Sequence, residues 1–188
     1  KNVTQITVVS KFLQLDIETI IDSKPIEIIE NGYNPEVIES ISKIPQNSKQ
    51  LSIALIGSTY KWHPVESFLK ELSVFNSEHK SQEIVLNLYG VNNSKEIINL
   101  ISSKYSNLLT STFVYERMEN QALLKRIKND NVMLLFNNYS FMGTKIFDYI
   151  GIKREILFCY SDDETANELK NKYYTIKERD EVSQTLQE

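Results

Sequence analysis

Residues 51–72 read LSIALIGSTYKWHPVESFLKEL, and two kinds of hydrophobic pattern follow one another in this stretch. The first six residues are almost all apolar, which is typical of a β-strand that helices cover on both faces. A glycine and a short polar loop come next. Apolar residues then recur at helical spacing, at Val65, Phe68, Leu69 and Leu72. The stretch therefore predicts a buried strand, a loop and an amphipathic helix.

The same order of strand and helix repeats along the rest of the chain. Further strands are expected at residues 84–89, 112–115, 132–136 and 156–160. Helical stripes lie between them, at Ile97, Ile98 and Ile101 and at Leu123, Leu124 and Ile127. Because a helix separates each strand from the next, the order predicts an α/β fold with a doubly wound parallel sheet of the Rossmann-like kind.

The first 50 residues have a different pattern. The sequence predicts a strand at residues 6–10, a helix at 12–22, a second strand at 26–30 and a turn at 31–35. A polar stretch at residues 44–50 then leads into the main sheet. We therefore expect residues 1–50 to form connecting elements and residues 51–188 to form the main domain.

Composition narrows the class of protein. The chain has 188 residues, of which 41% are hydrophobic and 24% charged, as in an ordered globular domain. A net charge of −4 and a pI near 5.4 disfavour a nucleic-acid partner bound through a broad basic face. No apolar run approaches the ~20 residues of a membrane span. The chain opens on Lys1 rather than methionine, which suggests a piece of a longer protein.

The sequence contains no motif for a metal site or for a nucleophilic serine. Cys159 is the only cysteine, so no internal disulfide can form and a reducing compartment is expected. His63 and His79 have no cysteine, histidine or carboxylate set around them at metal-ligand spacing, so we expect no metal. Neither a G-x-x-x-x-G-K-S/T phosphate loop nor a G-x-S-x-G nucleophile elbow occurs.

The loop after the strand at residues 51–56 is the first candidate site. In an open parallel sheet, ligands bind beyond the carboxyl ends of the strands. Gly57 would let the backbone approach a phosphate, and Ser58 and Thr59 would add hydroxyl donors. The alternative is an ordinary strand-to-helix turn that requires a permissive glycine.

A second candidate follows the strand at residues 132–136. Gly143 and Thr144 precede an expected helix with the apolar face Ile146, Phe147 and Ile150. The helix amides and the Lys145 ammonium would bind a phosphate, and Asp148 would reach a neighbouring sugar hydroxyl. Alternatively, Thr144 caps the helix, Lys145 is solvated and Asp148 interacts with the helix dipole. Arg117, after the strand at 112–115, would pair with a phosphate or flank a base, or else form a surface salt bridge.

Four passages are similar to a known family. They are ITVVS with IEIIENGYNP (residues 6–10 and 26–35), LSIALIGSTYKWHPVESFLKEL (51–72), STFVYERMENQALLKRIKNDNVMLLF (111–136) and GTKIFDYIGIKREILF (143–158). In this order they resemble the carboxyl-terminal, donor-binding half of GT-B-fold nucleotide-sugar glycosyltransferases. The resemblance is to the retaining family four, or group 1, enzymes of bacterial polysaccharide synthesis. It implies that residues 1–50 join two halves and that residues 51–188 bind the nucleotide sugar.

The resemblance also implies roles for single residues. Gly57, Ser58 and Thr59 would face the donor diphosphate, with Lys61 as a basic residue nearby. Arg117 and Met118 fall where the family's loop borders the nucleobase. Lys145 and the amides around Gly143 and Thr144 would hold phosphate or sugar.

The fourth passage matches the family's E-x7-E motif only in part. Asp148 falls at the second acidic position, which accepts hydrogen bonds from ribose hydroxyls, whereas Ser140 stands at the first. Glu116 replaces the glycine of the third passage. The donor sugar, the stereochemical outcome and the catalytic residues stay open at this point.

The function that the resemblance implies is transfer of a sugar from a nucleoside diphosphate sugar to a saccharide or lipid-linked acceptor. The nucleotide sugar is the donor substrate, and no cofactor or metal is expected. The partner would be an amino-terminal acceptor-binding domain, in a cytoplasmic enzyme that associates peripherally with the inner face of the membrane. Two alternatives are a flavodoxin-like interaction or regulatory domain without nucleotide and a degenerate transferase half that acts as a scaffold.

Overall fold

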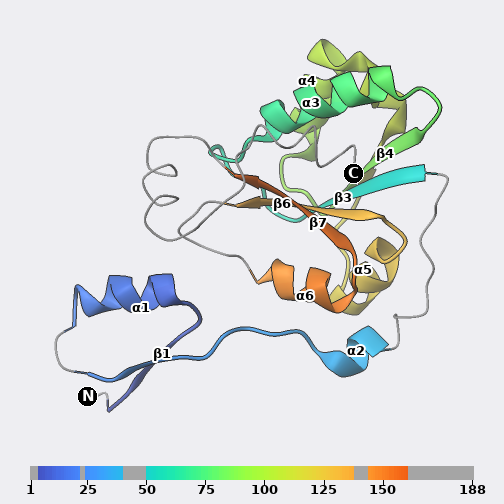
Figure 1. Ribbon diagram of the computed structural model, residues 1–188. Helices are drawn as coiled ribbons and strands as arrows, with labels where there is room; N and C mark the ends of the chain where they lie inside the picture. Colours follow the sequence, from blue (N-terminus) through green and yellow to red (C-terminus); the bar gives the residue numbers. More distant parts are fainter. Residues whose placement is uncertain (1–3, 22–23, 40–49, 138–143, 161–188) are drawn as a thin grey trace.

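The computed structural model describes residues 4–21, 24–39, 50–137 and 144–160 of the chain (Figure 1). From residue 50 onward its strands are β3 (Gln50–Ile56), β4 (Glu83–Tyr89), β5 (Thr112–Tyr115), β6 (Val132–Asn137) and β7 (Glu155–Tyr160). The helices between them are α3 (Val65–Glu78), α4 (Ser94–Lys104), α5 (Asn120–Ile127) and α6 (Lys145–Gly151). A short 3-10 helix, η1 (Ser106–Ser111), which the sequence did not predict, precedes β5.

The five strands form one parallel sheet in the order β5-β4-β3-β6-β7. β3 lies at its centre. The chain moves outward from β3 to β4 and β5, then returns to β6 on the other side of β3. This reversal creates a topological switch point between β3 and β6, where parallel sheets of this kind bind ligands. The predicted doubly wound α/β fold is confirmed.

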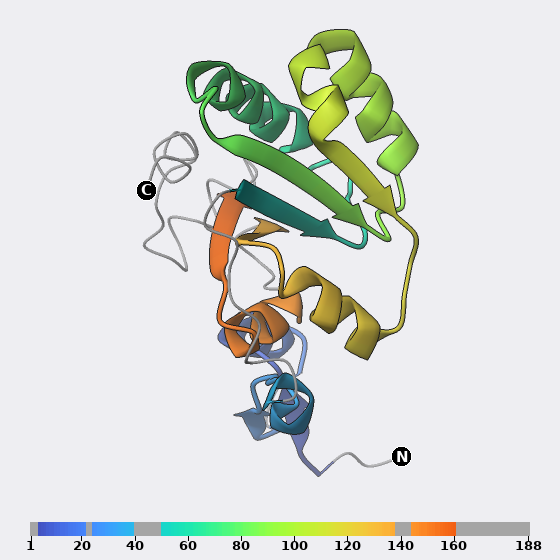
Figure 2. The same ribbon diagram turned by 90° about the vertical axis from the view of Figure 1, so that its right-hand side faces the viewer.

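Helices cover both faces of the sheet, with α3 and α4 on one face and α5 and α6 on the other (Figures 1 and 2). The alternation of side chains along β3 shows why both faces must be covered. Ile53 and Leu55 belong to the core under α3 and α4, whereas Ala54 and Ile56 belong to the core under α5 and α6. Successive side chains of a strand point to opposite faces, so an apolar strand requires two layers of helices.

The helical stripes expected from the sequence face the core, with one correction on α6. Ile146 is buried as expected, but Ile150 is 52% exposed and Tyr149 is 2% exposed. The predicted apolar face of this helix was therefore wrong at its last member. Tyr149 follows Ile146 by three residues rather than four, so the buried face is rotated by part of a turn.

The amino-terminal elements form a sheet of their own. β1 (Ile6–Val8) and β2 (Ile26–Ile28) pair in parallel, and α1 (Lys11–Glu18) connects them. These elements agree with the predicted strand, helix and strand, although each is shorter. Ser10 caps α1, since its side chain accepts a hydrogen bond from the Leu13 amide.

A short helix, α2 (Pro35–Glu39), lies where the sequence predicted the end of a turn. The Asn34 side chain accepts a hydrogen bond from the Glu36 amide at 3.0 Å and so starts the helix. Ile38 of α2 is buried in the core under α5 and α6. A Cβ on Gly151, at the end of α6, would lie 2.9 Å from the Tyr33 ring, so this segment packs closely against α6.

No helix in the described part of the chain combines the length and the apolar character that a bilayer crossing requires.

The packing of α3 on the sheet gives a test of the fold. Leu72 of α3 is fully buried, so Leu72→Ala should lower the free energy of unfolding by about 2–5 kcal/mol through lost burial and a residual cavity. Leu109→Ala is the control, because Leu109 is 41% exposed and its truncation should change stability by less than about 0.5 kcal/mol. Urea unfolding measures both. Equal losses would mean that α3 does not pack as described.

Candidate functional site

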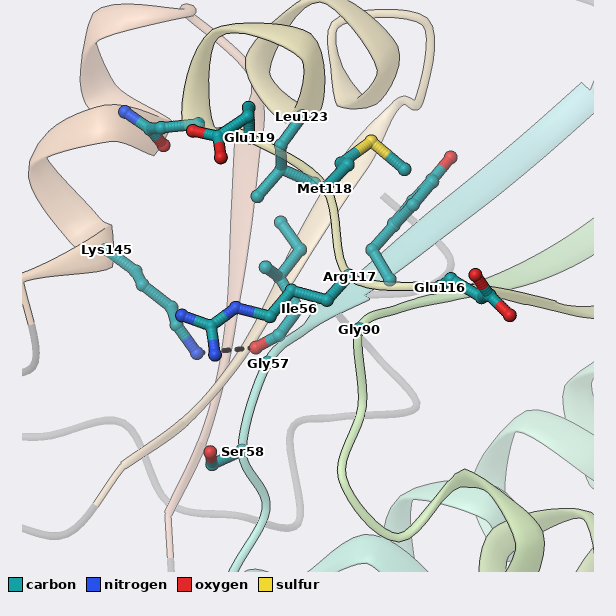
Figure 3. A pocket seen from close by; sticks show the side chains of 12 residues that line it. Ile56, Gly57, Ser58, Gly90, Glu116, Arg117, Met118, Glu119, Leu123 and Lys145 are labelled. Atoms are coloured by element: carbon teal, nitrogen blue, oxygen red, sulfur yellow. Dashed lines mark hydrogen bonds between the residues drawn. The ribbon is translucent and has the colours of Figure 1, made fainter.

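A cavity of about 520 Å³ opens at the carboxyl ends of β3, β4 and β5, next to the starts of α5 and α6 (Figure 3). Strand ends contribute Ile56 and Tyr89, and the loops after them contribute Gly57, Ser58, Gly90 and residues 116–118. Glu119, Asn120 and Leu123 come from the start of α5, and Lys145 comes from the first turn of α6. The cavity thus lies at the edge of the sheet where the sequence predicted a ligand.

Two glycines shape one end of the cavity. Gly57 has φ +75° and Gly90 has φ +58°, a left-handed conformation that residues with a Cβ rarely adopt. The Gly57 amide donates to the Tyr89 carbonyl and the Gly90 amide donates to the Tyr115 carbonyl, both at 2.9 Å. Each glycine therefore turns the chain sharply as its strand leaves the sheet.

The same glycines make room for two basic residues. A Cβ on Gly57 would lie 2.6 Å from the Lys145 Nζ, and one on Gly90 would lie 3.2 Å from the Arg117 Cα. Figure 3 shows the Lys145 and Arg117 side chains extending toward the Gly57 end of the cavity. Small residues at these strand ends thus allow two cations to line one cavity.

Lys145 is held by the backbone of β3. Its Nζ donates to the Ile56 carbonyl at 2.5 Å. Burial lowers the pKa of the ammonium group, because a desolvated charge is less stable than a hydrated one. Within the described ranges, no carboxylate forms an ion pair with Lys145 or Arg117. Among the described residues, the two cations at this end of the cavity thus have no carboxylate ion-pair partner, which suits an anionic ligand.

The other end of the cavity is apolar with a polar margin. Met118 and Leu123 pack against the core under α5 and α6. Glu119 lies beside Leu123 and supplies a carboxylate (Figure 3). Asn120 also lines the cavity and supplies an amide. One end can thus hold an anion while the other contacts a flat, partly apolar group.

A buried aspartate anchors the Tyr89 wall of the cavity. Asp130 is 3% exposed and accepts hydrogen bonds from the Tyr89 hydroxyl at 2.9 Å and from the Asn87 amide at 2.6 Å. Burial raises the pKa of the Asp130 carboxyl. The Tyr89 ring stacks on Tyr115 with centroids 4.8 Å apart. Tyr89 is therefore fixed both by its hydroxyl and by its ring.

The structure brings five of the residues predicted from the sequence together around the cavity. They are Gly57, Ser58, Arg117, Met118 and Lys145. Ser140 and Gly143, also predicted, lie outside the described residues.

Four further predicted residues do not line the cavity. Thr59 is buried, with its hydroxyl bonded to Asn93 and its amide donating to the Asn92 side chain at 2.9 Å, so it fixes the loop. Lys61 and Thr144 are exposed. Asp148 is half-buried one turn beyond Lys145, and burial raises the pKa of its carboxyl.

The sequence interpretation missed seven lining residues, which are Ile56, Tyr89, Gly90, Glu116, Glu119, Asn120 and Leu123. Gly90 carried a usable signal, because it follows an apolar strand just as Gly57 does. Glu119 and Asn120 carried no such signal. They line the cavity because α5 begins at Asn120, whereas the apolar stripe that marks this helix in the sequence starts only at Leu123.

The described residues contain no group of three or more His, Cys, Asp or Glu side chains that could hold a metal ion.

Three aromatic rings gather in the loop between β3 and α3. Tyr60 and Trp62 are stacked with centroids 5.8 Å apart and planes 7° apart. His63 packs edge-on against both, at 4.1 Å from Trp62 and 5.2 Å from Tyr60. Its Nδ1 accepts the Tyr60 amide at 3.2 Å. Burial, and then the charge of Lys145, lower the pKa of His63 from 6.5 to about 4.

The comparisons with known proteins agree with this architecture. No family model and no curated protein matches the sequence. Among solved structures, a variant of S. aureus TarM in complex with UDP aligns with a TM-score of 0.65 at 13% identity, over 99% of this chain and 37% of TarM. The pneumococcal O-GlcNAc transferase GtfA, in complex with UDP and GlcNAc, aligns with 0.64 at 14% identity, over 98% of this chain and 38% of GtfA. OtsA, a trehalose-6-phosphate synthase, aligns with 0.63 at 12% identity, over 98% of this chain and 51% of OtsA.

The fold is therefore that of a GT-B glycosyltransferase domain, and the fold that the sequence resemblance implied is confirmed. The chain spans well under half the length of TarM and GtfA.

The left-handed backbone of Gly57 gives a second test. Gly57→Ala places a Cβ where φ is +75° and where the Lys145 Nζ lies 2.6 Å away. We expect the free energy of unfolding to fall by about 1–3 kcal/mol. Gly32→Ala is the control, because nothing lies within 4 Å of the added Cβ there. Denaturant unfolding compares the two, and an equal effect would argue against the strain at Gly57.

The environment of His63 predicts a pH dependence. The unfolded chain binds the imidazole proton more tightly than the folded chain, so stability should fall as pH drops from 6.5 toward about 4 and level off below. Because the ring is only half-buried, solvent screening reduces the expected loss to roughly 1–2 kcal/mol. The measurement is the difference in unfolding free energy between wild type and His63→Gln at pH 7 and 4.5. A difference that stays constant with pH would contradict the assignment.

Proposed function

We propose that this chain is the donor-binding domain of a glycosyltransferase and binds a nucleoside diphosphate sugar in the cavity. The observation that carries the proposal is the pair of cations, Lys145 and Arg117, at a cavity end formed by a left-handed glycine. A diphosphate carries negative charge, which would neutralise these two cations. The cavity volume of about 520 Å³ also lies within the range of roughly 300–1,000 Å³ usual for small-ligand sites.

The cationic end would act on the leaving group. In glycosyl transfer from a diphospho-sugar, negative charge develops on the departing diphosphate, and fixed positive groups lower the barrier by stabilising that charge. Lys145 would supply a point charge, and Arg117 would supply a fork of N–H donors. The Ser58 hydroxyl would add a further donor.

The other end would hold the nucleoside. Met118 and Leu123 offer apolar contact for the face of a base, and the Asn120 amide offers both donor and acceptor atoms. We propose two carboxylates for the ribose hydroxyls. Glu119 lines the cavity. Asp148 does not line it, but lies one turn beyond Lys145, at the acidic position implied by the sequence resemblance, and would contact the ribose from the rim.

The acceptor would come from a second domain. TarM and GtfA, in structures that contain UDP, are more than twice as long as the part that this chain matches. We propose that a partner domain closes over the carboxyl edge of the sheet and binds a saccharide or lipid-linked acceptor. Cell-surface polysaccharide synthesis at the inner face of the membrane is the proposed setting.

Titration calorimetry with UDP, GDP and uridine tests the proposal. UDP or GDP should bind. Lys145→Ala should lower the affinity for that nucleotide about tenfold or more, because a charged hydrogen bond worth about 1.5–3 kcal/mol is lost. Uridine binding should change much less, because uridine lacks phosphate.

Lys70→Ala is the matched control, since Lys70 is an exposed lysine on α3. Equal weakening of UDP and uridine by Lys145→Ala would argue against the phosphate role of Lys145. If neither diphosphate binds at millimolar concentration, the donor-binding function is wrong and a non-catalytic interaction domain takes its place.

A further inference from the structure

Two large aromatic side chains face solvent near the cationic end of the cavity. Tyr60 is 57% exposed and Trp62 is 39% exposed, although both belong to a short loop between β3 and α3. Their planes are 7° apart with centroids 5.8 Å apart, so the rings are nearly parallel and offset. The two rings thus stack on each other, and part of each stays exposed to solvent.

His63 holds the pair in place through ring contacts and hydrogen bonds. His63 packs edge-on against both rings, and its own ring contacts Phe136 at the end of β6, with centroids 5.4 Å apart. The His63 Nδ1 accepts the Tyr60 amide at 3.2 Å, and the His63 amide donates to the Tyr60 carbonyl at 3.0 Å. Rigid aromatic rings lose little conformational entropy when a ligand binds.

The aromatic pair adjoins the proposed phosphate end without belonging to it. Tyr60 follows Ser58, a lining residue, by two positions, which separates their Cα atoms by at most about 7 Å. His63, which contacts both rings, lies close enough to Lys145 for the charge of Lys145 to lower the His63 pKa. Neither Tyr60 nor Trp62 lines the cavity itself.

From this arrangement we infer that the Tyr60–Trp62 pair is a stacking site for a pyranose ring of the saccharide acceptor. The site deepens the proposed function and rests on it. A pyranose presents a flat face of C–H groups and a rim of hydroxyls. The flat face matches the exposed part of the aromatic rings. The Tyr60 hydroxyl, the Trp62 indole N–H and the Lys61 ammonium can hydrogen-bond to the rim.

The position favours the acceptor over the donor. The donor nucleotide fills the cavity in the proposed complex, whereas the aromatic pair stands outside it and opens to solvent. An acceptor arriving from solution would rest on the pair with its next ring beside the phosphate end, where the transferred sugar leaves the donor. A nucleobase could also stack on aromatic rings. For a base bound here, however, the phosphates would have to turn back toward Lys145.

The sequence provides its own reporter, because Trp62 is the only tryptophan of the chain. The experiment titrates chitotetraose, cellotetraose and maltotetraose separately into the protein, with and without saturating UDP, and follows tryptophan fluorescence. We expect a saturable change with at least one of the three saccharides. Tyr60→Ala, which keeps Trp62 as the reporter, should lower the affinity for that saccharide about tenfold. The affinity of Tyr60→Phe should stay within about threefold of that of the wild type.

Phe113→Ala is the control for removal of an exposed aromatic ring elsewhere, since Phe113 is 45% exposed on the edge strand β5. It should leave saccharide binding unchanged. Circular dichroism of each variant checks that the fold is retained.

Three outcomes would overturn the inference: no saccharide changes the fluorescence in either condition, Tyr60→Ala binds as tightly as wild type, or UDP alone produces the whole change. UDP binding measured by calorimetry separates this failure from failure of the donor-binding proposal. Bound UDP without saccharide binding rejects only the aromatic site, whereas saccharide binding without UDP binding rejects only the donor site.

Discussion

The burial of β3 on both faces is the constraint on which the rest of the structure depends. Ile53 and Leu55 point to one layer of helices, and Ala54 and Ile56 point to the other. A strand of this kind is stable only at the centre of a covered sheet. Its central place puts the switch of chain direction next to it, so that the loop leaving β3, the loop leaving β4 and the start of α6 converge on one edge. The cavity follows from that convergence.

The chemistry of the cavity depends on small residues in addition to charged ones. Gly57 and Gly90 end neighbouring strands in the same left-handed conformation, and each is close to one of the two cations. A larger residue at either place would push Lys145 or Arg117 out of position. The backbone path thus sets the position of the positive charge, and the buried Asp130 fixes Tyr89, which also lines the cavity. The site is therefore built by the loops that leave the strands together with the first turns of α5 and α6.

The fold was largely predictable from the sequence because apolar runs and helical stripes record burial directly. Lys145 was predictable too, since it follows a strand and opens a helix. Other features were not. α2 was missed because Pro35 suggests a turn, whereas the Asn34 cap and the burial of Ile38 turn the same residues into a helix. On α6, Tyr149 and Ile150 follow Ile146 by three and four residues, and both spacings are helical. Periodicity alone therefore could not tell which of the two is buried. Glu119 and Asn120 line the cavity only because tertiary structure sets the start of α5.

The hydrogen bond from Lys145 to the Ile56 carbonyl orients the ammonium group, and this bears on which ligands the proposed site would prefer. A free lysine side chain would have to give up rotamer entropy of about 2 kcal/mol when it captures an anion. Here the hydrogen bond to Ile56 already orients the ammonium group before any ligand arrives, and the remaining N–H donors of the group can bind an anion. In the proposed donor complex, this orientation favours a diphosphate, because its several negative charges interact more strongly with the ammonium group than a weakly charged molecule does.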